Sequence, residues 1–202
     1  MRLRRMTYAV TMSRWAPNAR ERLEDAALDL FVENGYEDTT VAQIADRAGL
    51  NRATFFRHFA DKREILFGHD DVLSGLFASG IREAAPDASV VDCLQAALAA
   101  VGTVMTAEQQ HKASRRRAIA AANTEVQERG LLKQRAVVQA ITSALTERNV
   151  DPLTARLSAE VARLAFTVAL ERWVTAKAAD PFPPHATAAL DDLRHRIGVF
   201  QE

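Results

Sequence analysis

Hydrophobic side chains recur at spacings of three and four along most of the chain, which is the period of an amphipathic helix. The first such stripe consists of Leu23, Ala26, Ala27, Leu30 and Phe31. No stretch shows the sustained alternation of apolar and polar residues that a half-buried strand requires. The pattern therefore predicts an all-α protein with about nine helices.

The first helix is predicted to begin at Asn18, which forms a capping box with Glu21, and to end at Gly35. Three further helix starts follow closely between positions 40 and 61. They are marked by a capping box at Thr40–Gln43, a cap at Asn51 and a second box at Asp61–Glu64. Helices this short, with Gly49 supplying a tight turn between the first two, predict a helix-turn-helix unit.

Longer helices are predicted beyond this unit, the first running from Asp61 to about Ala84. Expected breaks lie at residues 85–87, 108–112, 149–152 and 180–185, and at Gly130. Asp151 and Pro152 supply a cap and a first-turn proline for a helix that can run to about Ala179.

The last two helices carry apolar residues over a wide arc, which indicates burial on more than one side. Two explanations fit: a four-helix interface between two copies of the chain, or completion of the core of a single copy. The residues expected in a homodimer interface are Leu157, Val161, Leu164, Val168, Leu190, Leu193, Ile197 and Phe200.

Composition narrows the class of protein. The 202 residues include 26 Lys and Arg and 26 Asp and Glu, so the formal charge is zero, and 48% of them are hydrophobic. Cys93 is the only cysteine, which fits a reducing cytoplasm. No apolar run approaches the length of a membrane-spanning helix. Residues 1–16 are interpreted as a disordered basic arm, and Met1, Met6 and Met12 are alternative starts.

Neutral overall charge hides a local surplus. Between Arg47 and Arg63 there are five basic residues and one acidic residue, which suits contact with a polyanion. A second basic run, residues 111–117, has no comparable motif around it. It is predicted to be a solvent-facing helix start rather than a second nucleic-acid site.

Enzymatic function is not expected. The five histidines have no metal-ligand spacing, there is no glycine-rich phosphate loop, and the serines lie in no nucleophile motif. Cys93, inside an apolar run, is expected to be a small core residue. Neither a metal nor a cofactor is predicted.

The run from Thr39 to Leu66 (TTVAQIADRAGLNRATFFRHFADKREIL) resembles the DNA-binding signature of the TetR/AcrR family of bacterial transcriptional regulators. With the preceding helix, the resemblance covers roughly residues 18–70. It implies a three-helix DNA-binding domain over residues 17–68, followed by a larger helical ligand-binding and dimerisation domain over residues 69–202.

The start of the helix after Gly49 can enter a major groove, where arginine reads guanine and threonine meets a base edge or a thymine methyl. The resemblance adds phosphate ligands, His58 and Lys62, and places Phe56 where the family usually has tyrosine. The residues expected at the DNA are Thr39, Thr40, Gln43, Asn51, Arg52, Ala53, Thr54, Phe56, Arg57, His58 and Lys62.

By resemblance, a small molecule in a cavity among the central helices would release the DNA. Inward-facing segments suggest a mostly apolar lining, with polar handles such as His111, Arg163 or Glu171. The residues expected at this ligand are Phe77, Leu94, Leu98, Val101, Met105, His111, Ile119, Arg163, Phe166, Leu170 and Trp173.

The sequence thus predicts a cytoplasmic, homodimeric transcriptional regulator, more readily a repressor, that binds a palindromic double-stranded DNA operator and responds to a largely apolar effector. The alternative is an architectural or nucleoid DNA-binding protein without a ligand. A cavity of a few hundred cubic ångströms would favour the regulator.

Overall fold

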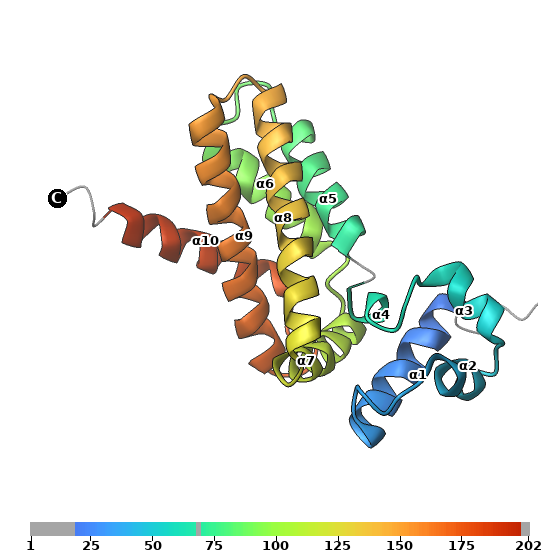
Figure 1. The fold of residues 1–202 in the computed structure, drawn as a ribbon. Helices are drawn as coiled ribbons and strands as arrows, with labels where there is room; N and C mark the ends of the chain where they lie inside the picture. Colours follow the sequence, from blue (N-terminus) through green and yellow to red (C-terminus); the bar gives the residue numbers. More distant parts are fainter. Residues whose placement is uncertain (1–18, 68–69, 199–202) are drawn as a thin grey trace, which may run out of the picture.

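A computed structural model describes residues 19–67 and 70–198, and within these ranges it contains helices and no strand. The helices are α1 (Ala19–Asn34), α2 (Val41–Arg47), α3 (Arg52–His58), α4 (Glu64–Phe67), α5 (Asp70–Glu83), α6 (Val90–Gly102), α7 (Ala107–Ala121), α8 (Thr124–Glu147), α9 (Pro152–Thr175) and α10 (Phe182–Gly198). Figure 1 shows α1–α3 as a small unit beside a larger helical body. The all-α prediction is confirmed; ten helical segments are described, of which α4 is a single turn.

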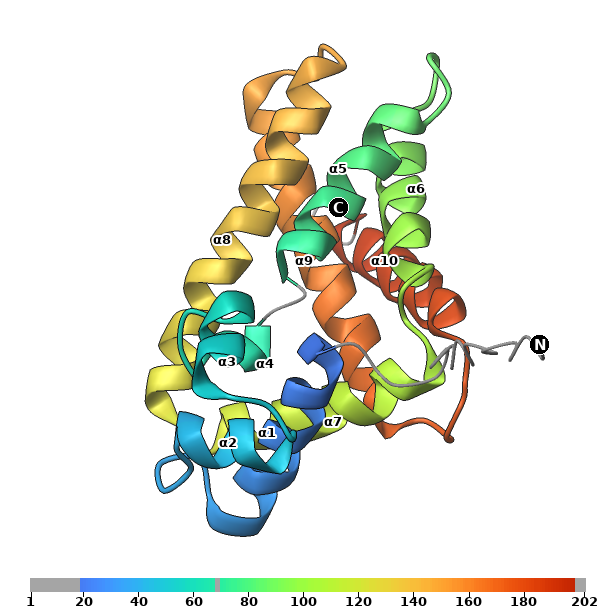
Figure 2. The same cartoon turned by 90° about the vertical axis from the view of Figure 1, so that its right-hand side faces the viewer.

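The small unit is held together by its own apolar core. Leu23 and Leu28 of α1, Ile44 of α2 and Phe55 of α3 are fully buried and belong to one cluster. The same cluster includes Ile119 of α7, so the core continues into the body. Figure 2 shows α7 passing beside α1 on this side of the molecule.

The larger body is a bundle in which α5 packs on α6 and α8, and α9 packs on α8 and α10. Helix α9 turns a face of fully buried alanines to its neighbours: Ala155, Ala159, Ala162, Ala165 and Ala169. Small side chains on this face let the surrounding helices approach closely.

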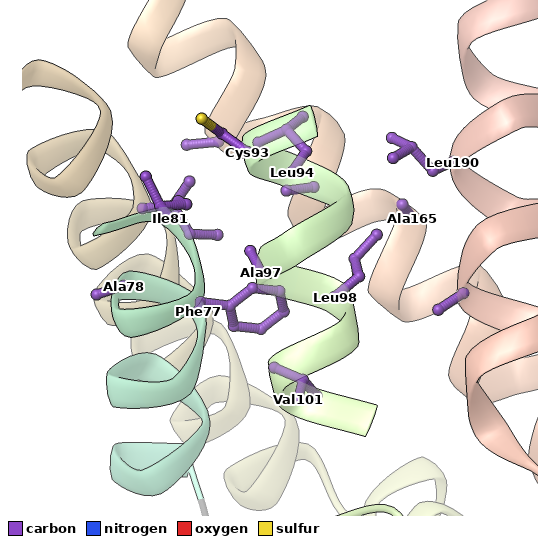
Figure 3. Packing of buried hydrophobic residues seen from close by; sticks show 14 of the residues in the cluster. Phe77, Ala78, Ile81, Cys93, Leu94, Ala97, Leu98, Val101, Ala165 and Leu190 are labelled. Atoms are coloured by element: carbon purple, nitrogen blue, oxygen red, sulfur yellow. The ribbon is translucent and has the colours of Figure 1, made fainter. Parts of the chain in front are cut away.

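The backbones of α5 and α6 approach each other closely at Gly80. A Cβ at Gly80 would lie 2.7 Å from the Ala96 carbonyl oxygen, so glycine is required for this approach. Figure 3 shows Phe77 of α5 directed at Ala97 in the same contact region.

Of the predicted breaks, the one at Gly130 is wrong, and those at 108–112 and 180–185 are displaced, because the structure has them at residues 103–106 and 176–181. Residues 108–112 lie inside α7, because Thr106 caps that helix and an i,i+4 pair of Glu108 with Lys112 supports its first turn. Helix α8 continues through Gly130, whose helical cost is only about 1 kcal/mol. Pro183 and Pro184 lie in the first turn of α10, where their missing N–H groups cost no helical hydrogen bond.

Two other boundaries differ from the prediction. The single helix expected from Asp61 to Ala84 is described as α4 and α5, on either side of residues 68–69. Helix α9 ends at Thr175, where Gln110 accepts the Ala179 N–H and donates to the Trp173 carbonyl. The predicted basic arm and the Asn18 cap lie outside the described residues.

No single helix in the described ranges is both long and apolar enough to span a membrane; α6 and α7 meet that test only together, across a 96° bend. The described residues also contain no group of three or more His, Cys, Asp or Glu side chains arranged to hold a metal ion.

Candidate nucleic-acid interface

The turn between α2 and α3 is rigidly fixed. Gly49 has a φ of +64°, a left-handed conformation that favours glycine. The Gly49 N–H donates to the Asp46 carbonyl (2.9 Å), and the Leu50 N–H donates to the Ala45 carbonyl (2.8 Å). Arg22 of α1 donates to the Ala48 carbonyl from outside the turn. The angle between α2 and α3 is therefore determined by backbone hydrogen bonds.

Helix α3 divides sharply into a buried and an exposed face. Phe55 is fully buried and packs against Phe59, with ring centroids 5.7 Å apart. Arg52, Ala53 and Arg57 are exposed, and Thr54 is half-buried. This is the face that the sequence predicts will meet base edges.

Two arginines stand out on that face. Among the described residues, neither Arg52 nor Arg57 makes a side-chain hydrogen bond or ion pair. The other basic residues of the local surplus are engaged: Arg47 with Glu33 (2.7 Å), and Arg63 with Asp61 and Glu125 (2.6 Å each). The hydrogen bond from Arg47 lowers the pKa of the Glu33 carboxyl. The cations available to an anion here are thus concentrated on α3.

The predicted capping residues do cap their helices. Thr40 and Gln43 form a complete capping box at α2, with the Thr40 N–H donating to Gln43 Oε1 at 2.7 Å. Asn51 accepts the Thr54 N–H at 2.8 Å and so starts α3. All three side chains are exposed, so DNA contact through them remains a prediction.

The predicted DNA contact of the Thr39 side chain is corrected by the structure. This side chain is buried, with 1% exposed, and its hydroxyl donates to the Gly35 and Leu30 carbonyls. The threonine ties the end of α1 to the start of α2, so its hydroxyl is not available for DNA.

Lys62 has a structural role that the resemblance does not imply. Its ammonium donates to the carbonyls of Tyr36 (2.8 Å), Glu37 (3.1 Å) and Thr39 (3.3 Å). The same nitrogen lies 4.4 Å from the centre of the Tyr36 ring. All three ammonium donors are therefore occupied by the loop between α1 and α2, and the predicted phosphate contact would have to displace one of them.

His58 and Phe56 offer few polar side-chain atoms to a DNA phosphate. The Nε2 atom of His58 is buried and has no hydrogen-bond partner among the described residues. Phe56 is half exposed and packs edge-on against Phe55. Any DNA contact by Phe56 is restricted to apolar packing, as its sequence predicts.

The second basic run lies within α7 rather than at a helix start and faces solvent only in part: His111 and Arg117 are exposed, whereas Lys112 is buried. The predicted solvent-facing position is therefore wrong for Lys112. Lys112 pairs with Asp25 of α1 (2.8 Å), and Arg115 pairs with Asp29 of α1 (2.6 Å). Lys112 is only 4% exposed. The run joins the body to the small unit, and the signal for this was an acidic α1 face of opposite charge: Glu24, Asp25 and Asp29.

Comparison with known proteins agrees with this geometry. Residues 23–68 match the family described as bacterial regulatory proteins, tetR family. The chain carries a TetR-family DNA-binding domain. Over 46 residues it is 52% identical to the HTH-type transcriptional regulator TcmR of Streptomyces glaucescens, and over 51 residues it is 45% identical to SrpR of Pseudomonas putida. These alignments take in 23% and 25% of this chain, and only 20% and 24% of the relatives' lengths.

Solved structures match over a longer range. Thermus thermophilus FadR, described as a TetR-family transcriptional repressor in complex with lauroyl-CoA, aligns with 85% of this chain and 91% of its own at 22% identity and a TM-score of 0.53. A complex of SmeT with triclosan aligns with 87% of this chain and 89% of its own at 20% identity and a TM-score of 0.55. The likeness of fold to these structures therefore extends over the body as well as the N-terminal domain.

A cavity of about 450 Å³ lies between the TetR-family domain and the body. Its walls include Met105, Phe166 and Leu170, three of the residues predicted at a ligand. The walls also include Leu66 and Phe67 of α4 and Arg116 of α7, which the sequence did not predict. These residues are far apart in the chain, and only the fold brings them to one cavity.

The other predicted ligand residues do not line this cavity. Phe77, Leu94, Leu98 and Val101 belong to the core of the body. Figure 3 shows Phe77 between α5 and α6, and Leu98 directed toward Ala165 and Leu190. Ile119 packs against the TetR-family domain, and Trp173 is fully buried in the core of the body. The cavity walls do not include His111, Arg163 or Glu171. The structure does not bring these residues to the cavity, because periodicity identifies an inward face without distinguishing core from cavity.

The leucine face of α9 lies opposite its alanine face. Leu153, Leu157 and Leu164 are 69%, 59% and 41% exposed, and Val161 and Val168 are half-buried. Leu190 is only 1% exposed and packs in the core of the body, so its predicted place in a dimer interface is wrong. Leu193 is half-buried, and the side chains of Ile197 and Phe200 lie outside the described residues.

Proposed function

We propose that the chain is a ligand-responsive transcriptional repressor that acts in the cytoplasm as a homodimer on a palindromic operator. The observation that carries the proposal is the exposed face of α3, where Arg52 and Arg57 hold guanidinium groups with no side-chain partner among the described residues. A guanidinium of this kind matches the O6 and N7 acceptors of guanine in a major groove.

The homodimer is supported by the leucine face of α9. Three large leucines on one helix face, 69%, 59% and 41% exposed, form an apolar surface that a second copy of the chain would cover. Two copies would present two α3 helices, and a palindromic site with half-sites about 34–36 Å apart would accept both.

The effector and the repressor role are supported by the cavity and by the structural relatives. A volume of about 450 Å³ suits a small organic molecule. FadR is described as a repressor bound to lauroyl-CoA and SmeT as bound to triclosan, and both ligands have large apolar parts.

The test is selection of bound fragments from the host genome by the purified full chain, followed by footprinting. We expect one or a few palindromic sites. The variant Arg52→Ala should relax specificity at one base position of each half-site, by about 1–3 kcal/mol. Equal binding of operator and random DNA by the wild-type protein would contradict the proposal and indicate an architectural protein.

Repression is tested separately with a reporter driven by the selected site. We expect expression of the chain to lower reporter output, and Arg52→Ala to restore it. Higher output with the wild-type chain would show activation instead.

A further inference from the structure

Arg116 of α7 faces two parts of the molecule. It lines the cavity, where its Nη1 lies 3.4 Å from Oε1 of the neighbouring wall residue Gln109. Its Nη2 lies 3.3 Å from Oε2 of Glu24 on α1, in the DNA-binding domain. The Arg116 side chain is 15% exposed, so it is largely shielded from bulk water.

Glu24 is a buried carboxylate. Only 1% of the residue is exposed, and this burial raises the pKa of its carboxyl, while Arg116, Arg20 and Lys112 act in the opposite direction. A carboxylate removed from water depends on its cationic partners. The position of the Arg116 guanidinium therefore matters to α1.

Glu24 connects through Arg20 to the end of the recognition helix α3. Its Oε1 lies 3.3 Å from Nε of Arg20. Arg20 also donates to the His58 carbonyl (3.4 Å) and lies with its guanidinium carbon 4.7 Å from the centre of the Phe59 ring. Three successive contacts thus lead from the cavity wall to the last residues of α3.

The cavity wall has an apolar part and a cationic part. The apolar part comes from α4, α5, α7 and α9 and from the loop between α6 and α7, and includes Phe67, Leu73 and Phe166. The polar side chains that line it are Gln109, Arg116 and Arg117, and no acidic residue is among the described lining residues. Arg117 is already paired with Glu171 at 2.9 Å. A molecule that fits both parts has an apolar body and one negatively charged group.

We propose that the effector is an anionic amphiphile whose acidic group binds Arg116 in competition with Glu24, and that this exchange transmits occupancy of the cavity to α3. The inference rests on the proposed ligand-responsive function and names its ligand class and its coupling residue. A ligand that takes Arg116 from Glu24 binds better when α7 and α1 are separated, so it stabilises the separated arrangement.

The experiment uses the full chain without DNA and two probes with the same tail, decanoate and decanol, measured by calorimetry below their aggregation concentrations. Wild-type protein should bind decanoate about tenfold more tightly than decanol, the usual gain from a charge-assisted hydrogen bond. Arg116→Gln should abolish this preference and leave decanol binding unchanged, whereas Arg116→Lys should keep part of it.

Glu24→Gln is the decisive variant. Removing the competing charge should tighten decanoate binding several-fold and leave decanol binding unchanged, a result that loss of packing alone would not give. The matched control is Glu171→Gln, which releases Arg117 in the same way. Tightening in the control and none in Glu24→Gln would assign the anion to Arg117 and overturn the proposal.

Equal affinity for the two probes, or no binding of either, would also overturn it. These outcomes are distinguishable from failure of the proposed function, because sequence-specific binding of the operator by the ligand-free protein is measured in a separate experiment. Where the operator has been selected, decanoate should release it from the wild-type protein and should release it less from Arg116→Gln.

Discussion

Lys62 fixes the loop between the first two helices of the DNA-binding domain. Its three donors each meet a backbone carbonyl, from Tyr36, Glu37 and Thr39. The position of α2 relative to α1 therefore depends on one side chain that comes from the segment just before α4.

We expect Lys62→Met to lower the free energy of unfolding by about 2 kcal/mol, because hydrogen bonds to a charged group are lost and the carbonyls lose their donor. Chemical denaturation with the full chain measures this. Arg57→Ala, which removes a cation of the same domain that has no side-chain partner among the described residues, should remain within about 0.5 kcal/mol of wild type. A Lys62→Met protein as stable as Arg57→Ala would show that the loop does not need the ammonium.

At the scale of elements, α9 has two apolar faces with different roles. The alanine face is buried in the bundle, and the leucine face is exposed. We expect the double variant Leu157→Glu, Leu164→Glu to convert the proposed homodimer to a monomer, because four like charges would then meet at the interface.

Sedimentation velocity measures the oligomeric state. Val32→Glu is the matched control, because it introduces a glutamate at a position that is far from α9 in sequence. Val32 lies on α1 and is 64% exposed. A dimer that persists in the double variant would place the interface elsewhere.

The local features of the fold could be predicted from sequence, since they depend on neighbouring residues. The caps at Thr40, Asn51 and Asp151 are examples, and each is formed as expected. Which face of α9 is buried could not be predicted, because both faces are apolar and the choice depends on the helices around it. The start of α7 differs from the prediction, because the Thr106 side chain accepts the Gln109 N–H and caps the helix before the polar residues 108–112.

In the candidate DNA site, too, local features could be predicted from sequence and tertiary contacts could not. The exposed arginines of α3 follow from the helix-turn-helix pattern, whereas the commitment of Arg47, Lys62 and Arg63 to other partners depends on tertiary contacts. The cavity was the least predictable part, since its walls come from segments far apart in the chain.

At the scale of the whole molecule, ion pairs join the DNA-binding domain to the body. Lys112 pairs with Asp25 of α1 and with Glu108 on its own helix, and Glu64 of α4 pairs with Arg129 and Lys133 of α8. Burial lowers the pKa of the Lys112 ammonium, but its hydrogen bonds to Asp25 and Glu108 outweigh burial, and the net pKa is raised. The same pair lowers the pKa of Glu108.

These shifts predict a pH window for the Lys112 contacts. A lowered carboxyl pKa contributes stability above its ordinary value of 4.5, which is lost as the pH falls through the folded-state pKa. A raised ammonium pKa contributes stability below its ordinary value of 10.5, which is lost as the pH rises through the folded-state pKa.

The loss of Tm in Lys112→Met should therefore be greatest between about pH 5 and pH 10 and should shrink on both sides of that range. Thermal unfolding of wild type and variant across pH measures this difference. A loss of Tm that stays constant from pH 3 to pH 7 would show that packing of the Lys112 stem, and not its charge, supports the joint.

The acidic face of α1 has a practical consequence for domain exchange. A chimera that grafts residues 19–67 onto the body of another regulator would bring Glu24, Asp25 and Asp29 without the α7 cations that neutralise them. Under the proposed function, such a graft would keep operator binding but lose the response to ligand, and it would carry negative charge at the new joint that no α7 cation balances. The transplantable unit is therefore discontinuous: residues 19–67 together with the matching face of α7.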